Sequence, residues 1–229
     1  MLVSKNNSGI TERQLIDCYR KVAIFSGLDN QVLDKVVNIS NIKHLRKGQF
    51  LYVPGESLDF YHIVLQGRIK LSKSTSHGRL VTIRIRNPGD SFGNTLIFTN
   101  DPLEIAVQAL DTVILSSIAK SDFMELCNSH HELLIAMIHQ MSKQIRKLGD
   151  TILEFATLSA TERLAKVICN LSQVSNEIPI THHEIADLAG TTRETATKII
   201  MQFSQEGIIN VSRGKLTVLD KSGLKIIGR

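Results

Sequence analysis

The spacing of apolar positions in the C-terminal third of the chain predicts two short α-helices joined by a tight turn. The apolar residues of the second helix recur every three or four residues, which places their side chains on one face. They are Ala196, Ile199, Ile200 and Phe203. Gly190 marks the turn, because glycine adopts positive φ without a steric penalty and often ends a helix.

Capping signals at the start of each helix support this prediction. Thr181 is followed three residues later by Glu184, and Thr191 is followed three residues later by Glu194. Each pair has the spacing of a capping box, in which the two side chains satisfy amide hydrogens that the first helical turn leaves free. Gly207 repeats the stop signal after the second helix.

Two short strands are predicted after these helices. Segments 208–211 and 215–219 are apolar or β-favouring, and Ser212, Arg213 and Gly214 separate them as a turn. A β-hairpin after a helical pair is typical of a winged helix-turn-helix.

Polar residues gather on the outer face of the second helix and near its start. At the N-terminus of a recognition helix, arginine and lysine pair with guanine, and glutamate accepts from cytosine. Arg193, Glu194 and Lys198 fit this chemistry. The alternative is an ordinary solvated face on a small helical hairpin, which charge alone would not exclude. The residues expected to contact DNA are Thr181, His182, Thr191, Thr192, Arg193, Glu194, Thr197, Lys198 and Arg213.

The middle of the chain carries a heptad pattern. Apolar residues are spaced alternately by four and three positions, which predicts a long helix with a narrow apolar seam. They are Leu134, Ile138, Met141, Ile145, Leu148, Ile152 and Phe155. Helices inside a single core usually carry a wider apolar face, so the seam favours a parallel homodimer. A twofold dimer would present two recognition helices to a palindromic operator.

The N-terminal half shows short strands bounded by turns, preceded by helical material at 11–39. The predicted strands are 50–53, 61–65, 69–73, 81–86, 105–110 and 113–117. Val81, Ile83 and Ile85 alternate with polar residues, so one face of that strand is expected to be buried. Closely spaced strands with regular turn signals favour a small β-barrel or β-roll.

Length and charge limit these predictions. The chain has 229 residues, of which 42% are hydrophobic, and this suits two modest domains. The formal net charge is +5, but residues 160–229 hold nine Lys or Arg against seven Asp or Glu, a difference of +2. The excess of positive charge there is small, so the DNA assignment depends on pattern rather than on charge.

The sequence also excludes several classes of protein. It has no apolar run of membrane-spanning length, and its first residues lack the hydrophobic segment of a signal peptide, so we expect a cytoplasmic protein without membrane contact. Cys18, Cys127 and Cys169 are scattered and odd in number. Reduced thiols are therefore expected rather than a disulfide framework or a zinc site, with a redox pair between subunits as the alternative.

Three segments resemble the cyclic AMP receptor and fumarate–nitrate regulator (CRP/FNR) family, and the resemblance covers nearly the whole chain. They are YHIVLQGRIKL at 61–71, NPGDSFG at 87–93 and TTRETATKII at 191–200. The resemblance implies an α+β fold with an N-terminal jelly-roll (β-roll) domain of the cyclic-nucleotide-binding type. It divides the chain into this sensor domain at 1–128, a dimerisation helix at 129–158 and a winged helix-turn-helix at 159–229. It also implies a transcriptional regulator that binds double-stranded DNA and contacts RNA polymerase.

The resemblance breaks down where cyclic AMP would bind. Cyclic-AMP-binding members carry a glutamate for the ribose and, about ten residues on, an arginine and a small hydroxyl residue for the phosphate. The corresponding positions here are Asn94, Glu104 and Ile105. A carboxylate in place of the arginine would repel a phosphate, which argues against cyclic AMP. The residues expected to line an effector pocket are Ile83, Ile85, Phe92, Gly93, Asn94, Glu104 and Ile105.

The identity of the effector stays open. Only Cys18 lies in the region where the family's iron–sulfur members bind their cluster, which argues against one here. A small organic effector is at least as well supported as haem, for which six histidines are candidate ligands: His44, His62, His77, His130, His131 and His139.

Two other classes of protein have less support in the sequence than a regulator. A cyclic-nucleotide-binding regulatory subunit acting on a protein partner would use the same β-roll, but the winged helix argues against it. An enzyme has little support, because the sequence has no nucleophile elbow, phosphate-binding glycine loop or HExxH motif. No catalytic or metal-binding residues are predicted.

Overall fold

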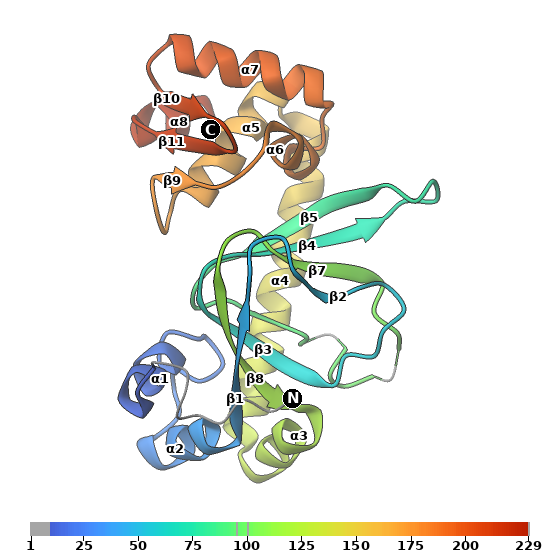
Figure 1. Cartoon of the computed structure of the whole chain (residues 1–229), viewed down its shortest axis with the longest axis vertical. Helices are drawn as coiled ribbons and strands as arrows, with labels where there is room; N and C mark the ends of the chain where they lie inside the picture. The colour runs from blue at the N-terminus through green and yellow to red at the C-terminus, as the bar shows by residue number, and fades with distance from the viewer. Residues whose placement is uncertain (1–9, 95, 100, 229) are drawn as a thin grey trace. The chain divides into compact units, whose positions relative to one another are not determined.

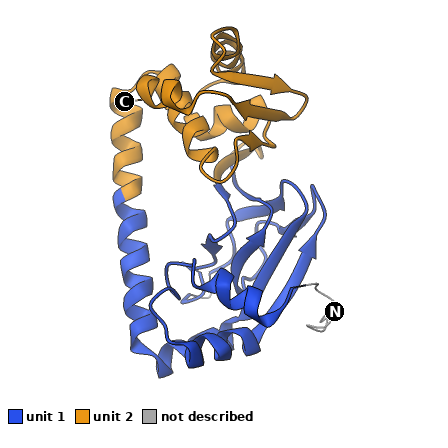
Figure 2. Cartoon of the chain, turned by 90° about the vertical axis from the view of Figure 1, so that its left-hand side faces the viewer, with its two compact units in different colours: residues 1–74, 85–146 blue, residues 75–84, 147–229 orange. Residues whose placement is uncertain are grey.

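The chain folds into two compact units. A computed structural model describes residues 10–94, 96–99 and 101–228. One unit comprises residues 1–74 and 85–146, and the other comprises residues 75–84 and 147–229 (Figure 2). The first nine residues, on which the expectation of no signal peptide depends, lie outside the described residues. None of the helices in the described ranges is long and apolar enough to cross a membrane.

Two four-stranded sheets form the body of the first unit (Figure 1). The strand order of one sheet is β1 (Ser40–Leu45), β8 (Val113–Ala119), β3 (Phe60–Gln66) and β6 (Ser91–Phe92). The order of the other is β2 (Phe50–Tyr52), β7 (Ile105–Ala109), β4 (Ile69–Ser74) and β5 (Leu80–Arg86). The predicted N-terminal β-roll is therefore confirmed. The tip of the β4–β5 hairpin, residues 75–84, belongs to the second unit.

Helices flank the strands along the sequence. The predicted helical material at 11–39 forms α1 (Glu12–Tyr19) and α2 (Asn30–Ile39). The long heptad segment forms α4 (His131–Thr157), which contributes to both units. Strands β1 and β6 and helix α3 (Lys120–Ser129) were not predicted. β6 has only two residues, and the sequence of β1, SNIKHL, gives a weak periodic signal.

The core of the first unit joins these helices to the sheet that contains β3. Tyr19 and Tyr61 are fully buried in it, and the ring of Tyr61 stacks on that of Phe123 at 4.5 Å between centroids. The Tyr19 hydroxyl donates to Ser40 Oγ at 2.7 Å and lies 2.6 Å from Ser116 Oγ. Aromatic side chains and their hydroxyl partners thus fix the helices against the sheet.

His62 is a fully buried histidine whose two ring nitrogens are both engaged. Nε2 lies 3.0 Å from the Tyr52 hydroxyl, and Nδ1 lies 2.8 Å from Ser117 Oγ. The ring stacks on Phe92 at 4.8 Å between centroids. Burial, assisted by the charge of Lys43, lowers the pKa of His62 from 6.5 to about 3. His62 is therefore neutral, and neither nitrogen is left open for a metal.

Replacement of His62 is expected to change how stability depends on pH. Between pH 6.5 and about 3 the unfolded His62 binds a proton that the folded residue does not, so stability falls as pH falls through this window. The slope approaches about 1.4 kcal/mol per pH unit from this group alone. Urea unfolding of His62→Gln should show a shallower acid loss than wild type. Exposed His139→Gln is the control, and equal slopes in all three proteins would contradict the prediction.

The second unit contains the predicted winged helix-turn-helix. Its helices are α5 (Ala160–Leu171), α6 (His182–Ala189), α7 (Arg193–Gln205) and α8 (Lys221–Ile227), and its sheet order is β10 (Ile209–Ser212), β11 (Lys215–Val218) and β9 (Glu177–Ile178). Neither β9 nor α8 was predicted. The predicted apolar face of α7 is buried, with Ile200 and Phe203 at its centre. None of the three cysteines forms a disulfide within the described chain; Cys127 and Cys169 are buried, and Cys18 is partly exposed.

Candidate nucleic-acid interface

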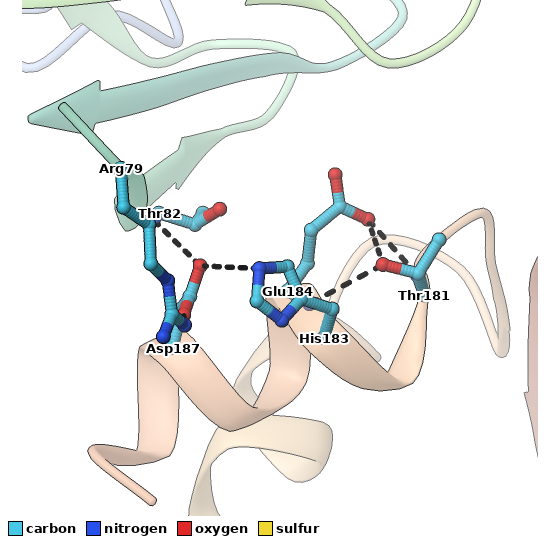
Figure 3. Close-up of polar contacts among 6 residues, drawn as sticks. All are labelled: Arg79, Thr82, Thr181, His183, Glu184 and Asp187. Atoms are coloured by element: carbon cyan, nitrogen blue, oxygen red, sulfur yellow. Dashed lines mark hydrogen bonds and ion pairs between the residues drawn. The ribbon is translucent and has the colours of Figure 1, made fainter. Parts of the chain in front are cut away.

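The first helix of the helix-turn-helix starts with the predicted capping box. The Glu184 amide donates to Thr181 Oγ1 at 3.2 Å, and the Thr181 amide and hydroxyl each donate to Glu184 Oε2 at 2.9 Å (Figure 3). Glu184 is buried, and these hydrogen bonds offset the desolvation of its carboxylate. The start of α6 is thereby fixed.

The second helix is capped one residue later than predicted. The proposed box between Thr191 and Glu194 is wrong: Thr192 is the N-cap, and its Oγ1 accepts from the Thr195 amide at 3.2 Å. The reason is that the Thr191 amide donates to Ala186 O at 3.0 Å and so completes the end of α6. As a result, Arg193 is the first residue of α7.

The turn between the helices depends on Gly190 and on two residues outside the motif. Gly190 has φ +60°, and a Cβ placed on it would lie 2.2 Å from Phe155 Cε1. Arg163 donates to Ala189 O at 2.8 Å and Leu158 O at 2.6 Å, and its guanidinium lies 5.2 Å from the centroid of Phe155. Arg163 and Phe155 therefore hold the turn against the end of α4, a role that the sequence pattern did not reveal.

Gly190→Ala is expected to destabilise the second unit. An L-residue in the left-handed conformation loses roughly 1–2 kcal/mol, and the added methyl group also displaces the Phe155 ring. The thermal midpoint should fall by several degrees, as measured by differential scanning calorimetry. Gly207→Ala is the matched control, because its φ is +73° but nothing lies within 4 Å of the added Cβ. Equal losses in both variants would contradict a role for the Phe155 contact.

A side-chain contact also joins the starts of the two helices. His182 Nδ1 lies 3.2 Å from Thr197 Oγ1. Burial, followed by the charge of Arg193, lowers the pKa of His182. His182 is therefore neutral near pH 7. Its ring contacts Thr197 and also lines the hollow described next.

The helix-turn-helix and the wing enclose a hollow of about 1070 Å³. Of the nine residues predicted to contact DNA, seven line it: Thr181, His182, Thr191, Thr192, Arg193, Glu194 and Arg213. Thr197 is not on the lining but contacts His182, which is, and Lys198 is exposed further along α7. Residues that the sequence analysis missed also line it: Arg79, Ile180, His183, Val211, Ser212, Gly214, Lys215 and Leu216. Arg213 and Gly214 form the tip of the wing, and Gly214 has φ +69°.

The hollow carries both signs of charge at the start of α7. The pKa of Glu194 is lowered by hydrogen bonds from its own backbone amide and from Thr192. The charges of Arg193 and Arg79 lower it further. Glu194 is thus an ionised acceptor beside two guanidinium groups. Such a set can donate to phosphates and guanine and accept from cytosine.

The tip of the β4–β5 hairpin is bound to α6. Arg79 Nη2 donates to Asp187 Oδ1 at 2.8 Å, and the Thr82 amide donates to Oδ2 at 2.9 Å (Figure 3). The expected burial of Ile83 is wrong, because its exposed fraction is 49% whereas that of Thr82 is 3%. The simple alternation fails at this point of β5, where the backbone amide of Thr82 is bound to α6, whereas Ile85 is buried as expected.

The structure brings only some of the predicted effector residues together: Ile105 packs against the core cluster that contains Phe92. Phe92, Gly93 and Asn94 are consecutive at the end of β6, and Asn94 Nδ2 lies 3.4 Å from Gln144 Oε1 on α4. Glu104 pairs with Lys73 at 2.6 Å on the surface. Glu104 and Ile105 line a hollow of about 410 Å³ together with Leu96, Ile85 is buried, and Ile83 belongs to the second unit.

The predicted seam residues lie on α4, and most of them are exposed. Ile138, Ile145, Leu148 and Ile152 face solvent, and Met141 is half-buried. The residues at the two ends of the seam, in contrast, make contacts within their own chain. Leu134 packs against the core of the first unit, and Phe155 packs against Gly190 in its own chain.

Comparisons with known proteins agree with this architecture. A cyclic nucleotide-binding domain model matches residues 42–130, and a Crp-like helix-turn-helix domain model matches residues 162–227. The transcriptional regulator SdrP of Thermus thermophilus is 30% identical over 76% of this chain and 85% of its own length. The anaerobic regulatory protein of Haemophilus influenzae is 28% identical over 86% of this chain and 80% of its own length. A solved CRP/FNR-family regulator, also from Thermus thermophilus, has a TM-score of 0.68 at 26% identity, covering 82% of this chain and 97% of that one.

A β-roll of the cyclic-nucleotide-binding type followed by a winged helix-turn-helix defines a DNA-binding transcriptional regulator. The chain belongs to the CRP/FNR family of transcriptional regulators. The resemblance predicted from the sequence is thereby confirmed, and the protein is a regulator rather than an enzyme.

Proposed function

We propose that the protein is a homodimer that binds a palindromic DNA operator under the control of an effector sensed by its β-roll. The observation that carries this proposal is the hollow at the start of α7. There the recognition helix, the turn before it and the wing converge, with Arg193, Glu194 and Arg213 on the lining. Helix N-termini and wing residues of this kind contact bases and phosphates.

The exposed stripe on α4 supports the homodimer. Ile145 and Ile152 are 68% and 71% exposed, and the spacing of the stripe is that of a coiled-coil seam. A contiguous apolar stripe on a single chain favours burial against a second copy. The same helix leads directly into the DNA-binding unit, so dimerisation would place two recognition helices on one operator.

The effector that we propose is not cyclic AMP. Glu104 occupies the position of the family's phosphate-binding arginine, where it forms a surface ion pair with Lys73, and the sequence has no arginine between Arg86 and Arg146. Gln140 offers a different chemistry, because its Oε1 is buried without a hydrogen-bond partner among the described residues. An effector with a neutral donor group beside Asn94 and Gln140 would satisfy this atom. An organic molecule of this kind fits these residues better than an anionic nucleotide.

Three further parts of the proposal follow from the family. The division into a sensor at 1–128, a dimerisation helix at 129–158 and a DNA-binding domain at 159–229 assigns one task to each segment. Contact with RNA polymerase would convert operator binding into a change of transcription. The cytoplasm, where DNA and polymerase are accessible, is the proposed location.

Selection of binding sites from a random DNA pool tests this function. Purified protein without added effector is incubated with the pool, bound DNA is enriched, and visible absorption is recorded on the same preparation. Recovery of a palindrome supports the dimeric regulator. A Soret band in the visible spectrum would identify haem, rather than an organic molecule, as the effector. A folded dimer that enriches no sequence, either alone or with an effector library, would contradict the proposal.

A further inference from the structure

The hairpin tip 75–84 is held against the helix-turn-helix by one buried carboxylate. Asp187 has a side chain that is only 2% exposed, and both of its oxygens accept from the hairpin, Oδ1 from Arg79 and Oδ2 from the Thr82 amide (Figure 3). His183 Nε2 approaches the same carboxylate at 3.9 Å. Since both acceptors are engaged, the position of Arg79 relative to α6 is well defined.

Arg79 also faces the DNA-binding hollow. It lines the hollow together with Thr192, Arg193 and Arg213, and its side chain is 56% exposed. A guanidinium has five N–H donors, and the ion pair with Asp187 is made through Nη2. The exposed part of the group can therefore reach a second anion without leaving Asp187.

Although Arg79 is paired with Asp187, basic side chains outnumber acidic ones on the lining of the hollow, where Arg79, Arg193, Arg213 and Lys215 accompany Glu194. The hairpin segment 75–84 contains Arg79 and Arg84 but no acidic residue. The acidic residue of the recognition helix that responds to Arg79 is Glu194, whose pKa is lowered chiefly by its own amide and Thr192 and further by Arg193 and Arg79. Arg79 thus adds positive charge to the same surface that carries Arg193.

We propose that Arg79 binds a phosphate of the DNA backbone, so that the β4–β5 hairpin supplies part of the DNA interface. This inference rests on the proposed function. Arginine recognises phosphate through a planar fork, and a buried carboxylate behind the fork holds it in the orientation that binding requires. Asp187 is then a positioning residue, and Arg79 contributes to affinity for DNA of any sequence rather than to the choice of bases.

Two other roles for Arg79 give different results. If the ion pair with Asp187 only fastens the hairpin, its loss leaves the salt dependence of DNA binding unchanged. If the hairpin obstructs the hollow, removal of Arg79 strengthens DNA binding. A phosphate contact instead makes binding weaker and less dependent on salt.

The test compares Arg79→Ala with Arg84→Ala on the selected operator over a series of salt concentrations. Each lost phosphate contact lowers the slope of log K against log salt by about 0.9, hence by about 1.8 for two subunits. The advantage of wild type over Arg79→Ala should therefore shrink about twelvefold between roughly 50 and roughly 200 mM salt. Arg84→Ala, which removes the same charge from the same hairpin but does not line the hollow, should keep the wild-type slope.

Two further measurements separate a lost contact from a disturbed hairpin. Arg79→Lys retains the positive charge, so its slope of log K against log salt should stay near that of wild type. It lacks the guanidinium that fastens the hairpin to Asp187. Hydrogen exchange of the Thr82 amide reports whether the hairpin still contacts Asp187. An unchanged salt slope or tighter binding in Arg79→Ala would overturn the phosphate contact of Arg79 but leave the proposed function intact. A wild-type protein that binds no DNA would overturn the proposed function as well.

Discussion

The double variant Ile145→Glu, Ile152→Glu is expected to be monomeric and to bind the operator at least about a hundredfold more weakly. Both side chains lie on the exposed stripe of α4. In a twofold dimer each would face its own copy, so the variant would place four carboxylates in an apolar seam. Breaking the pairing removes the gain of binding two half-sites with one molecule, which is commonly about 10²–10⁴ in affinity.

Sedimentation equilibrium measures the change in mass, and circular dichroism confirms that α4 is still helical. Ile226→Glu is the control, since Ile226 is exposed on α8 and lies outside the seam. That variant should remain dimeric and bind the operator normally. A double variant that still sediments as a dimer would show that the seam lies elsewhere.

Local patterns accounted for most of the fold because they record burial directly. The apolar face of α7 and the glycine stop at Gly190 were predicted and are present. The box between Thr181 and Glu184 was also predicted correctly, whereas the cap of α7 was misplaced by one residue. The box motif could not show that Thr191 is used by the end of α6, because that hydrogen bond depends on the turn geometry.

Contacts between distant segments were outside the reach of local patterns. Arg79 and Asp187 are far apart in the sequence, and neither residue type by itself indicates a partner. Ile83 was expected to be buried because it alternates with polar residues, but it is exposed, and its neighbour Thr82, whose amide is bound to α6, is buried. Arg163 was missed for a similar reason, since its partners are backbone carbonyls that any sequence supplies.

The effector site shows what can and cannot be learned by matching residues of this chain to the family's cyclic-AMP-binding motif. Matching along the motif identified Asn94 and Glu104 as departures from the cyclic-AMP-binding pattern, and in the structure Glu104 pairs with Lys73 on the surface. Matching could not identify Gln140, whose buried Oε1 becomes visible only when α4 is packed beside β6. The chemistry of the effector is therefore argued from the helix as much as from the strands.

Arg193→Ala and Lys198→Ala are each expected to reduce affinity for the selected operator by about tenfold to about a hundredfold, with little change in binding to unrelated DNA. Arg193 begins α7 at the hollow, and Lys198 is exposed one to two turns further along the same helix. A contact with a base edge contributes about 1–3 kcal/mol of discrimination, which is lost with the side chain. Both variants should remain dimeric, because neither residue lies on the α4 seam.

Operator and scrambled DNA are titrated in parallel by fluorescence anisotropy, with Lys225→Ala as the control for loss of one positive charge. Lys225 lies in the last turn of α8, away from the residues that line the hollow. If Arg193→Ala weakens both DNAs equally, Arg193 contacts phosphate and not a base, since only base contacts distinguish sequences. If neither variant changes operator affinity, α7 is not the recognition helix, and the hollow at its N-terminus has another partner.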